Sequence, residues 1–116
     1  MALIGETYQN DALAATAVLV KTGKTKIKGY HIYNPGNAAA YIQFFDAAAA
    51  SDVNVGTTVH KAAIGIPRGG GQQTVTQTVR GLCNMKFTLG LVIACTSGVA
   101  TNGDPNAANV VTIEIS

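Results

Sequence analysis

The chain has 116 residues, the length of one ordinary domain. Charged residues make up 12% of it, against about 25% in an average soluble domain, and the net charge is +2. So small a net charge argues against nucleic-acid binding, and no apolar run reaches the roughly 20 residues of a membrane span. Uncharged polar and small residues must therefore cover much of the surface, and such a surface is easily desolvated when another protein chain docks.

The first dozen residues lack a clear hydrophobic period. We expect residues 1–12 to form an extended N-terminal arm and residues 13–116 to form the domain. Leu3, Ile4 and Tyr8 are the apolar points of this arm, and they would anchor it on a neighbouring chain. The arm has neither the basic start nor the long apolar run of a secretory signal.

Short β-like runs separated by turn residues fill the rest of the chain. The predicted strands are, in order, 14–22, 26–34, 39–46, 53–55, 58–66, 73–79, 85–96 and 109–116. The TGKT sequence around Gly23 predicts a hairpin between the first two strands. Gly90 interrupts the longest strand, as expected at a bulge or a close approach of backbone.

No segment predicts a long helix. The alanine run at 47–50 is too short to sustain one and predicts a loop or a single helical turn. Many short strands with frequent turns predict an all-β fold. We expect a single-domain antiparallel β-sandwich, jelly-roll-like, with a small barrel as the alternative.

Several predicted strands carry apolar side chains on both faces. Under strict alternation, Tyr30 and Tyr33 lie on opposite faces of strand 26–34. Phe44 and Phe45 do the same in the next strand. A sandwich strand in a monomer normally has a polar outer face, so we expect the outer face to be an interface and the protein to form a homo-oligomer.

The titratable residues form no recognisable catalytic or metal-binding motif. The acidic residues are scattered, and no two have the spacing of a general acid/base pair. His31 and His60 lie within predicted strands without a partner motif, and we expect packed, hydrogen-bonded histidines. We therefore predict no enzymatic activity, no cofactor and no metal site.

The remaining candidates have structural interpretations. Cys95 lies in an apolar run and is expected to be a buried thiol; a bridge to Cys83 would require that the two face each other, and we expect them not to pair. The GIPRGGG sequence lacks the Lys-Ser/Thr of a phosphate-binding loop, so we expect a turn from which Arg68 meets an acidic group of a partner. The lysines at 21–28 predict a solvated hairpin tip.

A central segment, 26–71, resembles small virion proteins of tailed bacteriophages. The resemblance rests on the strand end Tyr33-Asn34, the YIQFFD strand at 41–46, the alanine run and the strand end IPRGGG at 66–71. It covers less than half of the chain and transfers no functional residue. It implies a β-sandwich made in the bacterial host cytoplasm and located on the virion. The role it implies is a capsid decoration (cement) protein, often a trimer, bound to the major capsid protein.

A carbohydrate- or receptor-binding module of a phage tail or fibre is the alternative. Tyr30, Tyr33 and Tyr41 would then form a stacking platform. The absence of Trp argues against it, because sugar-binding platforms favour large aromatic side chains.

Overall fold

A computed structural model describes residues 6–69, 71–75, 85–99 and 101–116, with the side chains of 71–75 left out. The described chain is all-β. Its strands are β1 (Glu6–Leu13), β2 (Val18–Thr22), β3 (Thr25–Asn34), β4 (Ala40–Asp46), β5 (Ala62–Ile66), β6 (Gly71–Val75), β7 (Met85–Phe87), β8 (Gly90–Thr96) and β9 (Asn109–Ile115). A single 3-10 turn, η1 (Ala50–Asp52), is the helical element of the described residues.

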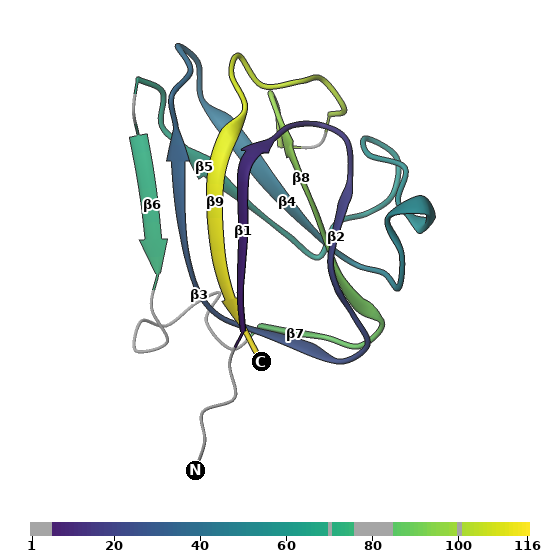
Figure 1. Cartoon of the computed structure of the whole chain (residues 1–116). Helices are drawn as coiled ribbons and strands as arrows, with labels where there is room; N and C mark the ends of the chain where they lie inside the picture. Colours follow the sequence, from purple (N-terminus) through teal and green to yellow (C-terminus); the bar gives the residue numbers. More distant parts are fainter. Residues whose placement is uncertain (1–5, 70, 76–84, 100) are drawn as a thin grey trace.

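The strands form two antiparallel sheets (Figure 1). Sheet A has the order β1-β9-β3-β6, with β7 also paired to β3, and sheet B has the order β2-β8-β4-β5. The hairpin predicted at Gly23 is wrong, because β2 pairs with β8 while β3 pairs with β6, β7 and β9. The chain crosses from one sheet to the other at this turn, and local sequence cannot distinguish such a crossing from a hairpin.

The two sheets pack face to face around one apolar core. Tyr30 of sheet A meets Phe44 of sheet B edge-on, with ring centroids 6.4 Å apart and ring planes at 86°. The fully buried members of this core come from both sheets: Leu13, Ile27, Ile32, Ile42, Phe44, Ile66, Phe87, Leu91, Ile93, Cys95, Val111 and Ile113. The sandwich-like, all-β prediction is therefore confirmed at this level.

Most of the predicted N-terminal arm belongs to sheet A. Residues Glu6–Leu13 form β1, which pairs antiparallel with β9 from Glu6 opposite Ile115 to Asn10 opposite Val111. The predicted domain boundary at residue 12 therefore falls inside a strand. Leu3 and Ile4 lie outside the described residues.

The long strand predicted at 85–96 is two strands in different sheets. The chain leaves sheet A after Phe87 and enters sheet B at Gly90. The carboxylate of Asp46 accepts hydrogen bonds from the backbone N–H groups of Thr88 (3.1 Å), Leu89 (2.8 Å) and Gly90 (3.4 Å). Three successive N–H groups that converge on one carboxylate cannot continue a straight β-ladder, so Asp46 fixes the crossing.

Asp46 makes the stability pH-dependent. Burial alone would raise the pKa of Asp46, but the three backbone hydrogen bonds and the charge of Lys61 outweigh it and hold the pKa below its usual value of 3.8. A lowered pKa gives stability that is present above the unfolded-state pKa and is lost as pH falls through the folded-state pKa. We expect Asp46→Asn to lower the free energy of unfolding by about 1–2 kcal/mol at pH 7.

Urea unfolding between pH 7 and pH 3 measures this effect. The difference between wild type and Asp46→Asn should begin to shrink near about pH 4, where the unfolded-state carboxylate starts to protonate, and should shrink further as the pH approaches the lower pKa of the native carboxylate. Asp52→Asn is the control, since Asp52 is exposed and its carboxylate has no hydrogen bond within the described chain. A gap between wild type and Asp46→Asn that stays constant with pH would contradict the role assigned to the carboxylate.

The outer face of sheet B is covered by the chain itself. Phe45, Val92 and Ala94 point away from the main core and form a second buried cluster with Ala47. Partly buried residues of neighbouring segments close it: Ala17, Ala50, Val53 and Val55. Residues 53–55 are thus a covering segment rather than the predicted strand, while 47–52 contains the expected single helical turn.

A polar contact closes the rest of this face. The side-chain amide of Gln43, which is 1% exposed, donates to Thr96 Oγ1 (2.8 Å) and to the carbonyl of Thr101 (3.1 Å). The loop after β8 therefore lies over the upper part of sheet B. The interface that Phe45 of β4 predicted with another chain is thus replaced by contacts within one chain, and the outer positions Val92 and Ala94 of β8 are covered in the same way.

Candidate protein-binding surface

The outer face of sheet A has no described segment across it (Figure 1). Strand register places Gln9, Thr112 and His31 in one row across β1, β9 and β3. Thr112 Oγ1 donates to Gln9 Oε1 at 2.7 Å, so both side chains lie on this face. We call the exposed or half-buried outward residues of β1 and β9, with those of β3 from Gly29 onward, the sheet A face: Thr7, Gln9, Asp11, His31, Tyr33, Val110, Thr112 and Glu114.

The central row of the sheet A face, through Thr112, contains no Asp, Glu, Lys or Arg. The acidic members Asp11 and Glu114 lie outside this row, and Lys26 lies below the face on the same outer side of β3. Tyr33 is 36% exposed, which places a ring edge at the surface. No charged side chain needs desolvating in the central row, so a second protein chain could cover this row at low electrostatic cost.

A bulge in β3 decides which of its side chains reach the surface. The register with β9 shifts between Ile27 and Gly29, so Ile27 and Tyr30 both face the core. Tyr30 is 6% exposed and is therefore not available to a partner, contrary to its assignment as a contact residue. Tyr33 remains on the outer face. Strict alternation fails at this strand because a bulge inserts one residue.

The upper end of the sandwich is a rigid cluster of loops. Asn34 is fully buried, and its amide donates to the carbonyls of Ala38 (2.9 Å), Ile66 (3.3 Å) and Pro67 (3.2 Å). Its Oδ1 accepts from the N–H of Gly36 at 3.0 Å. One buried side chain thus ties the β3–β4 turn to the β5–β6 turn.

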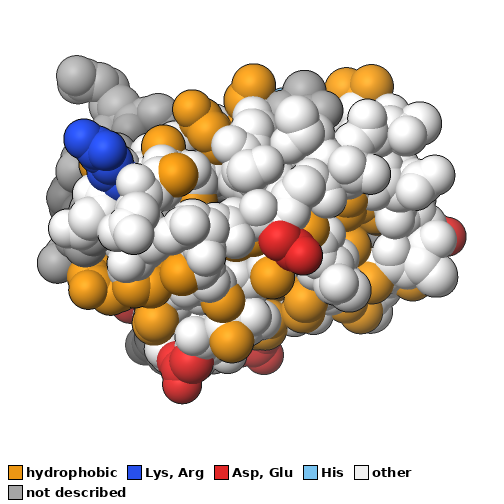
Figure 2. All heavy atoms as spheres, turned by 90° about the horizontal axis from the view of Figure 1, so that it is seen from above, with side chains coloured by type: hydrophobic (Ala, Val, Ile, Leu, Met, Phe, Trp, Pro, Cys, Tyr) orange, Lys and Arg blue, Asp and Glu red, His pale blue; other side chains and the backbone are white. Residues whose placement is uncertain are grey.

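The loop before β9 joins the same cluster. Asn106 Oδ1 accepts from the N–H of Asn37 (2.6 Å), and Asp104 Oδ1 accepts from the N–H of Ala15 (3.2 Å). Figure 2 shows this end of the molecule, where hydrophobic and uncharged polar groups dominate and charged groups are sparse. Arg68 is exposed in the β5–β6 turn, directly after Pro67, and so lies at the same end as Tyr33.

The sequence-predicted contact residues are thus dispersed. Tyr33 and Arg68 are at the surface, whereas Tyr8 is half-buried against the main core and its hydroxyl accepts from Asn10 Nδ2 at 3.0 Å. Gln9 and Thr112, at the centre of the sheet A face, were missed by sequence reasoning. The polar-apolar alternation along β9 was the signal that could have located Thr112, whereas β1 has no such alternation to mark Gln9.

The described residues contain no group of three His, Cys, Asp or Glu side chains that could hold a metal ion. Cys95 is a free, fully buried thiol, as expected, and burial raises its pKa to about 12. It is therefore a packing residue rather than a nucleophile. Cys83 lies outside the described residues. None of the helical structure described could cross a membrane.

No protein family and no curated protein sequence matches this chain.

Proposed function

We propose that this chain is a non-catalytic structural protein of a tailed-phage virion, with a jelly-roll fold. In this proposal it self-associates, as a trimer, and decorates a lattice of the major capsid protein. Strand pairing supports the fold: β1 pairs with β9, β2 with β8, β3 with β6 and β4 with β5, all antiparallel. With β7 left out, each of these pairs lies, in sequence, between the two strands of the preceding pair. A long antiparallel hairpin that is rolled into a jelly roll has this pairing, and the jelly roll is an architecture of viral capsid domains.

The observation that carries the assembly role is the difference between the two outer faces. The outer face of sheet B is covered by the chain's own segments, whereas the sheet A face is open across the described residues. The space between the sheets is filled by fully buried side chains, so it offers no room for a ligand. Protein–protein contact through the sheet A face is the use of the molecule that these features favour.

The carbohydrate-binding alternative has weaker support. Tyr30 is in the core and Tyr33 is on the outer face of sheet A. Tyr41 is on the outer face of sheet B, where its ring edge lies under Gly65. Three tyrosines in three separate places do not make a platform on which sugar rings could stack.

Light scattering during size-exclusion chromatography tests the assembly role. We expect wild type to elute with the mass of three chains, and Thr112→Arg, at the centre of the sheet A face, to elute as a folded monomer that still unfolds cooperatively on heating. Val59→Arg is the matched control, since Val59 is 90% exposed in the segment beside sheet B. A monomeric wild type, or an oligomer that survives Thr112→Arg, would overturn self-association through this face.

Co-sedimentation tests the virion role separately. Purified protein should pellet with capsids built from the major capsid protein that is encoded in the same genome. Binding should saturate at a fixed ratio of chains to capsid subunits. A gene that lies outside any phage or prophage, or protein that stays in the supernatant at saturating capsid, would overturn the decoration role while leaving the oligomer result intact.

A further inference from the structure

A groove opens at the lower end of the sandwich, at the end opposite the loop cluster. It has a volume of about 470 Å³ and is formed by the start of β3, by β7 and by the last residue of the chain. Its lining residues are Lys24, Thr25, Lys26, Lys86, Phe87, Thr88 and Ser116. Three of these seven side chains are lysines, so the groove is strongly basic although the whole chain has a net charge of only +2.

Two of the lysines lie directly opposite each other on adjacent strands. Lys26 of β3 pairs with Lys86 of β7, while the flanking pair Thr25 and Phe87 is buried. Both ammonium groups therefore leave the sheet on the same, outer side. Like charges directly opposite each other destabilise a sheet, so this pair is unfavourable for folding alone.

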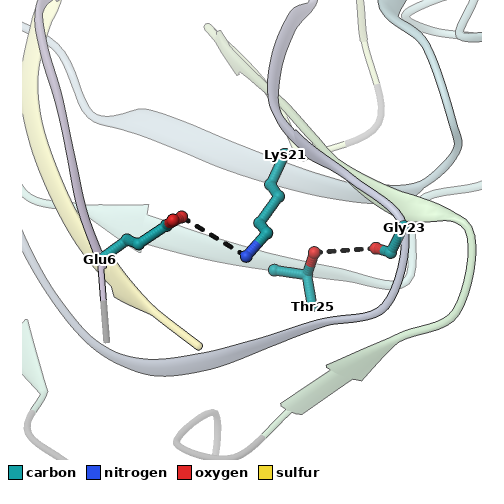
Figure 3. A network of polar contacts seen from close by, with 4 residues as sticks. All are labelled: Glu6, Lys21, Gly23 and Thr25. Atoms are coloured by element: carbon teal, nitrogen blue, oxygen red, sulfur yellow. Dashed lines mark hydrogen bonds and ion pairs between the residues drawn. The ribbon is translucent and has the colours of Figure 1, made fainter. Parts of the chain in front are cut away.

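No acidic side chain of the described residues neutralises these lysines. An ion pair joins Lys21 to Glu6 at 3.4 Å, across the two sheets (Figure 3). Glu6 is thereby used by a lysine outside the groove. The Asp46 carboxylate is held by backbone N–H groups at the β7–β8 crossing. Three lysine side chains therefore outnumber the one anionic group of the lining, the terminal carboxylate of Ser116, and an anionic partner would offset the remaining positive charge.

We propose that this groove binds an acidic, carboxylate-rich segment of a partner protein chain. Lysine ammonium groups are compact point charges that suit single carboxylates, and no arginine is among the lining residues. Phe87 is 1% exposed and Lys61 lies 5.2 Å from its ring centroid, so the groove offers no open ring on which a nucleic-acid base could stack. The groove is separate from the row through Thr112, and it would act in a monomer or an oligomer.

Fluorescence anisotropy with a labelled hexaglutamate peptide tests this site at low and at physiological salt. We expect Lys26→Gln and Lys86→Gln each to weaken binding about fivefold, with affinity falling as salt rises. Lys21→Gln is the matched control: it removes one positive charge from a lysine outside the groove that is already paired with Glu6, and it should leave affinity within about twofold of wild type.

Lys86→Glu separates binding from structure. It replaces a like-charge cross-strand pair with an opposite-charge pair, so the thermal midpoint should rise by about 3 °C while peptide binding is lost. Three outcomes would overturn the proposal: equal binding of a hexaserine peptide, an equal loss with Lys21→Gln, or tighter binding of a single-stranded oligonucleotide of the same charge. Light scattering of each variant separates a change in oligomer state from a loss of the groove.

Discussion

Phe45→Ala is expected to lower the free energy of unfolding by about 3–5 kcal/mol, the range for removal of a fully buried phenylalanine. Phe45 is 1% exposed, although its side chain points away from the main core. It packs with Val92 and Ala94 beneath the segment that contains Val53. Its ring also meets His60 edge-on, with centroids 6.2 Å apart. Truncation would leave a cavity that this covering segment cannot fill.

Urea unfolding, compared with the solution mass of the same samples, distinguishes burial of Phe45 by the chain's own segment from burial by a second chain. If the chain's own segment covers Phe45, stability falls and the oligomer state is unchanged at low urea. Val59→Ala in the same segment is the control and should change stability by less than about 0.5 kcal/mol, since Val59 is 90% exposed. A loss below about 1 kcal/mol together with dissociation of an oligomer would mean that another chain covers the outer face of sheet B.

Several strand positions were predictable from the sequence because they depend on local signals. The turn at Asn34-Pro35-Gly36 and the alternation around Val111 and Ile113 each mark an element that the structure contains. Sheet membership was not predictable. The hairpin expected at Gly23 requires β2 and β3 to be neighbours, and their actual partners lie dozens of residues away in the chain. Pairing at such distances leaves no trace in a short window of residues.

The surface was harder to predict than the fold, for two physical reasons. Apolar residues on both faces of a strand indicate that both faces are buried, but they do not indicate which chain covers the outer face. At Phe45 the covering segment belongs to the same chain. A one-residue bulge also moves every later side chain of a strand to the other face. This is why Ile27 and Tyr30 both face the core, although strict alternation would place them on opposite faces of β3.

The basic groove was likewise predictable from the sequence only in part. The lysines that precede and begin β3 were visible as a local cluster, and their position beside a turn was expected. Lys86, which lies opposite Lys26, is distant in sequence, so the like-charge pair becomes evident only once β3 and β7 are paired. The expectation of a hairpin tip at this turn concealed it, because a β2–β3 hairpin would give Lys26 a different neighbour.

Gly90→Ala is expected to lower the free energy of unfolding by about 3–5 kcal/mol, through overlap and backbone strain together. A Cβ at this position would lie 2.6 Å from the carbonyl oxygen of Ala47 and 2.7 Å from that of Lys21. Both neighbours are backbone atoms, and Ala47 is itself tied down by a hydrogen bond from its N–H to the Gly90 carbonyl at 3.1 Å. Relief would therefore require the β7–β8 crossing and the segment after β4 to separate.

Gly23→Ala isolates the contribution of that overlap. Gly23 also has a positive φ, 86°, but a Cβ there would meet nothing within 4 Å, so its substitution should lower stability by only about 1 kcal/mol. The urea midpoints of Gly90→Ala and Asp46→Asn compare two ways of disturbing the β7–β8 crossing. Gly23→Ala, in the β2–β3 turn, serves as the reference for a positive φ without overlap. Because Asp46 and Gly90 act on the same turn, the double variant should lose less stability than the sum of the two. A Gly90→Ala loss no larger than that of Gly23→Ala would show that the backbone at the crossing yields readily, and that Asp46 rather than the close approach holds the two sheets in register there.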